Sequence, residues 1–598
     1  MRLEYGLNMA NSPTNTNRLS DGGVDFLLGV NSNLNPRNLN SAQLSWGINI
    51  INKGGDIDTR PGYDSIFRLP DGKAQGMVAF TPTGGNTNLV MAVNGLIYVS
   101  EFPFTDYEQL PNIAFDPNVD HVSFKEALQA KDGATVIEPK AVLLMQDGKS
   151  KPAYWDGFVS RHLNPGIPSN ETVQGLWMEW IGNRLWVARG RELFASDIFD
   201  PLHFTENTYL SIGGSLNAMD GDVITMLART ADSQSLLVFT IHNTTIIQAG
   251  ITDRSAWATT PSFISLLFPG VGSAAGKSGF YHNGELWWYS VEGSRRFTQV
   301  GATIRNSRNG VSSIEMRRSF DNITKQVQSK VCGFSFNTFV GHSVPSGDVF
   351  NRHTWVLDTS TNSQLSSDAP LAWQGVWMGT RPVEWVTLNV MGVERVFHIS
   401  QDACGIRVWE AFKPNRLDNG ARIFCSVEFP GLLFGEKISF KKFRYDEFYL
   451  TRLIGEVDLT IDYRGDAGCW KNILDIELCA THCFNTVVCD GPNKTIMNQN
   501  RYIRTQEGEH YCADVDGWPT SENIGSFFQS RIRWYGRNGV NKYKSFADQW
   551  QEPSHGACEK SDAVCKILAC CDPEIEYISH VSDCSYGYSS TQGTCCSI

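Results

Sequence analysis

The sequence predicts an all-β protein: a β-propeller of six to eight blades, a following β-sandwich-like domain and a small Cys-rich C-terminal tail. Three features of the 598 residues lead to this prediction. Helical periodicity is scarce, short apolar runs bounded by Gly, Asn, Asp or Pro recur along most of the chain, and the 15 Cys are placed very unevenly. Short runs that alternate or are continuously apolar are typical of strands.

The spacing of the apolar runs over residues 21–415 favours a propeller. Their units end about 51 residues apart, which suits a four-stranded blade, whereas separate β-sandwiches would need roughly 100 residues each. Asn-Gly or Gly-Asn pairs precede several aromatic-rich runs, and both residues accept the positive φ of a tight hairpin turn. The clearest runs are Asn94–Ser100, Ala153–Gly157, Gly182–Ala188, Leu236–Ile241, Asn283–Val291, Thr354–Leu357, Arg395–Ile399 and Ile406–Trp409.

The pattern changes after residue 415. Glu456–Tyr463 and Arg531–Trp534 alternate polar with apolar residues, as a strand with one wet and one buried face does. With Lys437–Phe440 and Tyr445–Leu450, they predict a second all-β domain. The expected organisation is an N-terminal polar arm at 1–20, a propeller at 21–415, a β-sandwich-like domain at 420–552 and a Cys-rich tail at 553–598.

Twelve of the 15 Cys lie between Cys469 and Cys596. The tail has too little apolar content to fold by burial alone, so we expect cross-links to stabilise it. Its seven Cys leave one unpaired, which Cys512 or another subunit would resolve. Before the tail, Cys479, His482 and Cys483, with Cys489 nearby, could supply three or four zinc ligands instead of forming disulfides, although no second Cys-x-x-Cys pair accompanies them. The disulfide candidates, without assigned partners, are Cys469, Cys479, Cys483, Cys489, Cys512, Cys558, Cys565, Cys570, Cys571, Cys584, Cys595 and Cys596.

The charge and the N-terminal segment restrict the class of protein. A net charge of −12 argues against sequence-independent DNA binding, which needs clustered Lys and Arg. The polar N-terminus lacks the apolar stretch of a secretory signal, and no run of eighteen apolar residues follows. We therefore expect a soluble chain made in the cytoplasm, which leaves its cysteine-rich end in need of a later oxidising environment.

Motifs for catalysis are incomplete. Gly272–Ser278 resembles a phosphate-binding loop, but Val271 stands where the pattern needs its first Gly. Gly341–Pro345 resembles a nucleophile elbow, but Pro345 replaces the second Gly. The twelve His are dispersed, with no pair at the spacing of zinc hydrolases. We expect no catalytic centre, no cofactor and no catalytic metal.

Two kinds of short motif have simpler interpretations. Asp197 with Asp200, and Asp220 with Asp222, are carboxylate pairs that a glycosidase could use. Asp-rich segments are more often turns, in which the side chain accepts hydrogen bonds from nearby backbone N–H groups. The integrin-type tripeptide Arg464–Asp466 follows a predicted strand, so we interpret it as a turn as well.

Several segments in a fixed order resemble the β-propeller tail proteins of short-tailed bacteriophages. The first is residues 21–63, which end in Asp58-Thr-Arg-Pro-Gly-Tyr63. The likeness covers residues 21–300 well and the second domain more weakly, through 437–463 and 531–550. The other segments are Lys151–Gly157, Ile181–Val187, Ala195–Phe204, Asp220–Thr225 with Leu236–Phe239, and Phe268–Ser273 with Glu292–Phe297.

This resemblance implies a structural virion protein of the phage tail rather than an enzyme. It implies a nozzle or hub ring of identical subunits, six as a rule, below the portal and adaptor, through which double-stranded DNA leaves the capsid without specific binding. Further partners would be the head-to-tail connector, tail fibres or spikes, and possible host surface contact at the Cys-rich end. Such a protein assembles in the host cytoplasm and oxidises after lysis. We expect Asp and Glu to line the lumen, because like charge reduces adhesion of DNA.

Two alternatives stay open. The first is a receptor-binding or glycan-processing propeller exposed at the tail tip, which would use the Asp pairs or the Cys-rich end. The second is a secreted bacterial propeller whose true start lies upstream.

Overall fold

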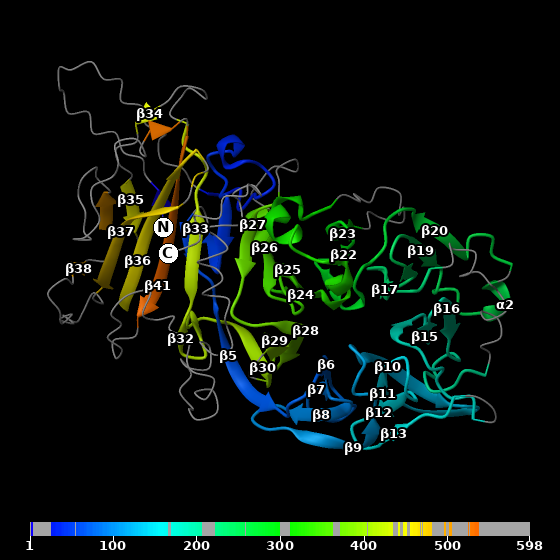
Figure 1. Cartoon of the computed structure of the whole chain (residues 1–598). Coiled ribbons are helices and arrows are strands. Elements are labelled where there is room, and N and C mark those ends of the chain that lie inside the picture. Colours follow the sequence, from blue (N-terminus) through cyan, green and yellow to red (C-terminus); the bar gives the residue numbers. More distant parts are fainter. Residues whose placement is uncertain are drawn as a thin grey trace, which may run out of the picture.

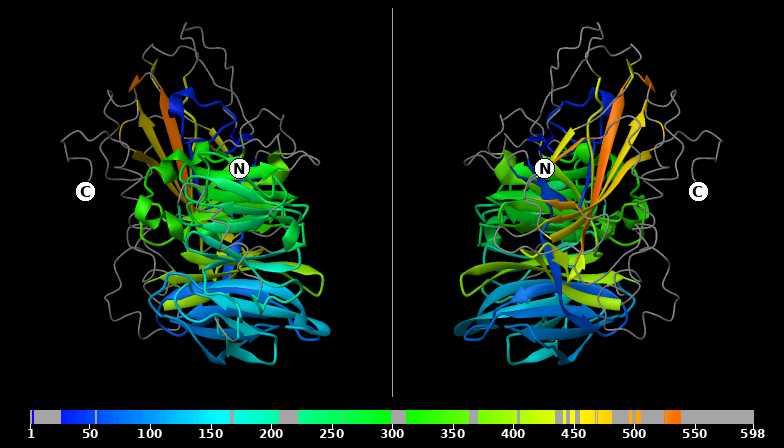
Figure 2. Two further views of the ribbon diagram at one scale, coloured as in Figure 1. Left: turned by 90° about the vertical axis from the view of Figure 1, so that its right-hand side faces the viewer. Right: turned by 90° about the vertical axis from the view of Figure 1, so that its left-hand side faces the viewer.

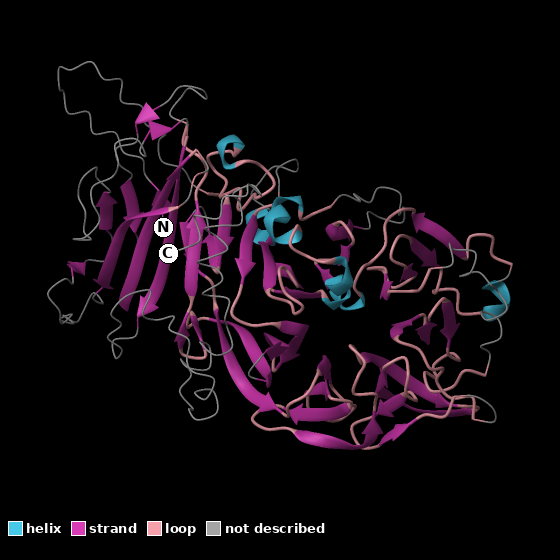
Figure 3. Ribbon diagram, viewed as in Figure 1, coloured by secondary structure: helices cyan, strands magenta, loops and turns pink. Residues whose placement is uncertain are grey.

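The computed structural model describes residues 2–3, 26–53, 56–165, 169–205, 222–257, 259–298, 311–362, 371–402 and 405–433, and shorter stretches between residues 441 and 537. Almost all regular structure within them is β-strand (Figure 3). The prediction of an all-β fold is confirmed. None of the helices in these stretches has the length and apolar character needed to cross a membrane.

Small antiparallel sheets follow one another in chain order around a central axis and form a β-propeller (Figure 1). The first strands of neighbouring blades contact each other, as β6 does with β10 and β28. Six sheets belong to the propeller alone: β6 (Ala74–Phe80), β7 (Asn88–Val93), β8 (Leu96–Glu101) and β9 (Glu108–Ala114); β10 (Ser123–Asp132), β11 (Thr135–Gln146), β12 (Ala153–Trp155) and β13 (Ser160–His162); β14 (Trp177–Ile181), β15 (Arg184–Arg189) and β16 (Glu192–Ala195); β17 (Met226–Arg229), β18 (Leu236–Phe239), β19 (Thr244–Ile247) and β20 (Ile264–Phe268); β21 (Phe280–His282), β22 (Glu285–Ser290) and β23 (Gly293–Thr298); and β28 (Pro382–Val390), β29 (Val393–Asp402), β30 (Gly405–Lys413) and β5 (Gly62–Leu69).

One further position in the ring is filled by β24 (Cys332–Phe336), β25 (Phe339–Val344), β26 (His353–Asp358) and β27 (Trp373–Trp377). These four strands are one end of a larger sheet that continues beyond the ring. The arrangement falls within the predicted range of six to eight blades.

The predicted Asn-Gly and Gly-Asn pairs are tight hairpin turns. Asn94 and Gly95 join β7 to β8 with φ of 51° and 80°. Gly182 and Asn183 join β14 to β15 with φ of 59° and 58°. Two consecutive residues with positive φ give the turn twist that matches antiparallel strands. These pairs therefore fix the register of the aromatic-rich strands beside them.

An N-terminal strand closes the ring. β5 pairs antiparallel with β30, with Leu69 opposite Ile406 and Phe67 opposite Val408. The last blade thus takes three strands from residues 382–413 and one from the beginning of the propeller segment. This pairing covers the outer edge of β30, which would otherwise present unpaired backbone groups.

A buried Arg–Asp pair lies beside this closing strand. The Arg60 guanidinium, fully buried, donates to Asp418 Oδ1 at 2.9 Å and to Asp418 Oδ2 at 2.5 Å. It also donates to Asn49 Oδ1, Pro61 O and Met378 O. Asp418 Oδ1 accepts a further hydrogen bond from the Tyr63 backbone N–H at 3.0 Å. We call these residues the Arg60 clamp; they tie the start of β5 to segments more than 300 residues away in the sequence.

The propeller and the second domain share one sheet of ten strands. Its order is β24-β25-β26-β27-β2-β33-β41-β36-β37-β38. The strands beyond the propeller are β2 (Trp46–Ile48), β33 (Phe424–Glu428), β41 (Phe528–Arg537), β36 (Gly455–Gly465), β37 (Lys471–Ala480) and β38 (Thr495–Met497). The side views show the yellow and orange strands of this sheet beside the green strands of the propeller (Figure 2). The predicted alternating strands pair with each other, with Asp462 opposite Arg531.

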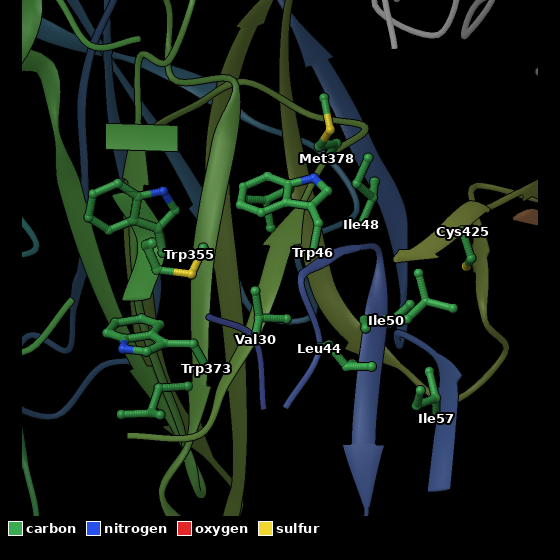
Figure 4. Close-up of a cluster of buried hydrophobic side chains, with 14 of the residues drawn as sticks. Val30, Leu44, Trp46, Ile48, Ile50, Ile57, Trp355, Trp373, Met378 and Cys425 are labelled. Atoms are coloured by element: carbon green, nitrogen blue, oxygen red, sulfur yellow. The ribbon is translucent and has the colours of Figure 1, made fainter. Parts of the chain in front are cut away.

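The largest buried cluster crosses from one domain to the other without a break. The cluster includes Trp355 and Trp373 of the propeller and Trp46 on β2 (Figure 4). Strand β2 lies between the propeller strands and those of the second domain. The same cluster continues through Val427 and Ile532. Each buried indole removes a large apolar area from water, so this cluster is a main source of stability at the junction.

A second, smaller sheet involves the N-terminal arm. β1 (Arg2–Leu3) pairs with β35 (Glu447–Leu450), which pairs with β39 (Arg501–Arg504). Arg2 lies opposite Tyr449 in this register. The first residues of the predicted polar arm thus pair with the second domain, which no pattern in the sequence indicates.

Candidate functional site

A cavity of about 420 Å³ lies on the axis of the propeller. Strands from six ring positions contribute to its wall, namely β10, β14, β17, β21, β24 and β28. Its volume is in the range of pockets that hold small molecules. The ionisable residues that line this axial cavity are His121, Lys125, Glu179, Lys277, Tyr281, Glu384 and Glu394.

Two of these residues neutralise each other. Lys125 Nζ on β10 lies 2.5 Å from Glu179 Oε1 on β14. Glu179 is buried and Lys125 is partly buried, so the two charges pair in a partly desolvated setting. This ion pair connects adjacent blades, and the two opposite charges neutralise each other.

Lys277 is placed differently. It belongs to the short helix η2 (Gly276–Ser278), and its Nζ donates to Val383 O on β28 at 2.8 Å. No carboxylate of the described residues lies within 4.0 Å of this ammonium. Lys277 therefore spans between two ring positions with a single carbonyl partner.

Glu384 is the carboxyl group nearest in sequence to that carbonyl. Its Oε2 accepts from the Met77 backbone N–H at 3.0 Å. Gly76 makes room for it, because a Cβ on Gly76 would lie 3.0 Å from Oε2. Burial raises the pKa of Glu384 to about 7, against the opposing effects of Lys277 and the Met77 hydrogen bond. The group is thus largely protonated in mildly acidic solution.

His121 is held neutral. Its Nδ1 lies 3.1 Å from Gln75 O, so this nitrogen carries the proton and donates to the carbonyl. The ring stacks on Trp177 with centroids 5.1 Å apart. Burial, and secondarily the Lys277 charge, lower the pKa of His121 to about 3. The remaining nitrogen, Nε2, is an acceptor.

Ser335 on the cavity wall contacts a histidine that no sequence motif links to it. Ser335 Oγ lies 3.0 Å from His282 Nδ1, and His282 Nε2 lies 3.0 Å from Thr359 Oγ1. A hydroxyl occupies the position where a hydrolase triad has a carboxylate. Burial lowers the pKa of His282, which weakens it as a base. The pair therefore differs from a hydrolytic triad in its orienting group and its basicity. Nothing in the spacing of Ser335 and His282 marks it, since the contact depends on the packing of β21 against β24.

The two incomplete catalytic motifs have structural roles. Ser278, at the end of the loop-like motif, donates to Ala275 O at 2.6 Å, and its helix is only three residues long. Ser343 of the elbow-like motif lies inside β25, where its Oγ contacts Thr354 Oγ1 and accepts from Trp385 Nε1. Neither motif forms the strand–turn–helix that its chemistry requires.

The predicted carboxylate pair Asp197 and Asp200 lies in a turn. Asp197 Oδ2 accepts from Thr205 N and Oγ1, whereas Asp200 Oδ2 accepts from Gly133 N at 2.7 Å and contacts His203 Nδ1 at 2.9 Å. Asp132, Asp200 and His203 bring three ligand-type atoms within 4.8 Å of one another. These contacts tie the β10–β11 hairpin to the loop after β16. Asp222 lies just before β17, and its partner Asp220 lies outside the described residues.

The integrin-type tripeptide is a turn only at its last residue. Arg464 and Gly465 belong to β36, where they pair with Gln529 and Phe528 of β41, and the turn begins at Asp466. Arg464 donates to Gln529 Oε1 at 2.8 Å and lies 4.2 Å above the Trp470 ring. Asp466, with φ of 48°, accepts from the Phe527 backbone N–H at 3.1 Å. Both side chains are engaged with the neighbouring strand.

The cysteine predictions fall outside the described residues. This holds for all twelve disulfide candidates except Cys479, whose backbone is in β37 and whose side chain is not described. The zinc alternative at Cys479, His482 and Cys483 is untested for the same reason. The cysteines with described side chains, Cys332 and Cys425, are buried free thiols, and burial raises the pKa of each to about 12.

Comparison with known proteins identifies no family. No family model matches the chain. No curated protein matches it either.

Solved structures share a limited overall likeness. The extracellular domain of BT4673 from B. thetaiotaomicron is 10% identical, with a TM-score of 0.34 over 80% of this chain and 60% of that domain. Virginiamycin B lyase from Staphylococcus aureus is 10% identical, with a TM-score of 0.33 over 58% of this chain and 98% of the lyase. YCF48 from Cyanidioschyzon merolae is 11% identical, with a TM-score of 0.35 over 60% of this chain and 100% of YCF48. The propeller itself is defined by the strand pairing of this chain.

Proposed function

We propose that this protein is a structural virion protein of a bacteriophage tail, a nozzle or hub subunit that assembles into a ring below the portal and adaptor. In this proposal the ring has six copies, forms part of the genome-ejection channel and carries other tail proteins. The ordered motifs that resemble tail propellers suggest the role, and the shared ten-stranded sheet is the observation that supports it best.

A subunit of an ejection channel must transmit load without separating into independent parts. Here the propeller and the second domain share backbone hydrogen bonds across β27, β2 and β33 and one buried cluster. The Arg60 clamp, formed by the Arg-Pro-Gly motif of the resemblance, adds buried charged hydrogen bonds at the same junction. This construction suits a rigid scaffold.

We also propose that the protein is not an enzyme. Three of the groups that the sequence offers as catalytic, Asp197, Asp200 and Ser343, bond to neighbouring backbone and side-chain groups. The one histidine–serine contact at the axial cavity has a hydroxyl in place of the orienting carboxylate.

Electron microscopy of the purified protein and of phage particles tests the proposal. We expect six-fold rings in solution and the same rings at the tail, with Asp and Glu dominating the inner wall. A protein that stays monomeric at assembly concentrations and is absent from purified particles would refute the tail role.

A receptor-binding or glycan-processing propeller at the tail tip is the second candidate, and the axial cavity favours it. Incubation of the purified protein with host surface polysaccharide separates the two. Cleavage of the polysaccharide contradicts the structural proposal, whereas adhesion without cleavage favours receptor binding.

A further inference from the structure

The Lys277 ammonium is an incompletely satisfied charge inside the axial cavity. Lys277 is partly buried, and no carboxylate of the described residues lies within ion-pair distance of its ammonium. Val383 O accepts one hydrogen bond at 2.8 Å, and an ammonium has three N–H groups. Two donors therefore remain for a molecule in the cavity.

The other charges of the cavity do not supply the missing partner. Glu179 is paired with Lys125 at 2.5 Å. Glu394 is exposed, and its Oε2 accepts from the Asn337 backbone N–H at 3.2 Å. Glu384 turns its Oε2 to Met77 N and lies beyond ion-pair distance of Lys277.

The protonation state of Glu384 affects how the cavity would interact with an anion. Because burial raises its pKa to about 7, the carboxyl group is protonated for much of the time near neutral pH and can then donate a hydrogen bond. His121, neutral and with Nδ1 directed at Gln75 O, adds no charge. The inner part of the cavity thus has one unpaired positive charge and a neutral acid.

We propose that the axial cavity binds a small carboxylate-bearing molecule of roughly monosaccharide size, anchored by the Lys277 ammonium. A single ammonium suits a carboxylate monoanion better than a phosphate, which generally requires several cationic or N–H donors. Ser335, Thr387 and Glu394 on the wall offer partners for hydroxyl groups of the same ligand. This inference does not depend on the tail role.

Binding of D-glucuronate to the full-length protein tests the proposal. Isothermal titration calorimetry at pH 6.5 is expected to detect D-glucuronate at millimolar or lower concentration and to detect D-glucose, which lacks the carboxylate, at least about tenfold more weakly. Failure of D-glucuronate to bind, or equal binding of the two sugars, overturns the proposal.

Two lysine variants assign the anchor. Lys277→Met keeps the hydrocarbon stem and removes the charge, so the affinity for D-glucuronate is expected to fall at least about tenfold. Lys149→Met is the matched control, because Lys149 is 62% exposed and pairs with Asp116 away from the cavity. Unchanged affinity in Lys277→Met, with a wild-type circular dichroism spectrum, overturns the assignment.

Glu384→Gln provides a measurement that does not require loss of Lys277. Ionisation of Glu384 above pH 7 places a negative charge beside the ligand, so wild-type affinity is expected to fall between pH 6 and pH 8. The other titratable groups near this position are Lys277 from η2, His121 and Lys125 from the β10 segment, Glu179 from β14, Tyr281 from β21, Cys332 from β24 and Glu394 from β29. Glu384→Gln is expected to abolish most of the fall, and a pH dependence identical to wild type contradicts the proposed geometry.

The ligand has two possible sources, a free organic acid or an acidic sugar of a surface polysaccharide. Comparing D-glucuronate with an oligosaccharide that ends in glucuronate distinguishes them. Comparable affinities indicate a polysaccharide terminus, whereas binding of the free acid alone indicates a diffusible acid.

Discussion

Replacing Asp418 by Ala tests the Arg60 clamp directly. The Arg60 side chain is 0% and that of Asp418 6% exposed, so the variant leaves a guanidinium buried without its counter-charge. It also removes the acceptor of the Tyr63 backbone N–H. Breaking a buried pair from one side costs about 3–5 kcal/mol, so the free energy of unfolding is expected to fall by that amount.

Urea unfolding followed by tryptophan fluorescence, together with amide hydrogen exchange in β5 and β30, measures the effect. Asp71→Ala is the control, because Asp71 pairs with Arg68 on the same closing strand but is 76% exposed, and exposed pairs contribute about 0–1 kcal/mol. Equal losses in Asp418→Ala and Asp71→Ala would refute the interpretation of the clamp. Unchanged exchange in β5 would refute its role in ring closure.

Three further predictions concern pH and backbone conformation. Glu384→Gln should stabilise the protein by up to about 3 kcal/mol at pH 8 and leave it unchanged at pH 4. The raised pKa of about 7 costs stability only above the ordinary value of 4.5, where the unfolded chain releases this proton and the folded chain retains it; melting temperatures at both pH values decide this. Gly182→Ala should cost at least about 2 kcal/mol more than Gly190→Ala by urea unfolding: both have φ near 60°, but only at Gly182 would a Cβ lie 2.1 Å from Ala249 O. The hydrogen bond to Asp200 raises the pKa of His203, so the protonated imidazole stabilises the folded protein at low pH and this stabilisation is lost as the pH rises. The melting temperature of the wild type should therefore exceed that of His203→Gln by more at pH 5.5 than at pH 8.

The sequence determined much of the propeller because its signals are local. Asn94-Gly95 and Gly182-Asn183 specify positive φ at two consecutive residues, and a hairpin follows from that alone. The alternation in Glu456–Tyr463 and Arg531–Trp534 likewise predicted strands, and the two pair in β36 and β41.

The axial cavity and the Arg60 clamp could not be predicted from the sequence, because their residues are far apart along the chain. Lys277, Glu384 and His121 come together only because three ring positions converge on one axis, and no spacing in the chain encodes that. Arg60 and Asp418 are separated by 358 residues, so no residue near Arg60 in the sequence indicates its partner. Polar contacts between distant segments depend on tertiary packing, which periodicity does not report.

The shared sheet means that the predicted propeller boundary at residue 415 cuts through structure that both domains need. A chain that ends at residue 415, the predicted end of the propeller, would lose Asp418 and with it the counter-charge of Arg60. It would lose β33 as well, which would expose the edge of β2 and the buried side chains of Trp46 and Ile48. An unpaired apolar edge promotes association, so we expect this truncated chain to aggregate, whereas the full chain stays soluble. Size-exclusion chromatography of the two proteins decides the matter. A monodisperse, cooperatively melting 1–415 fragment would show that the propeller is stable alone and that the shared strands contribute little to it.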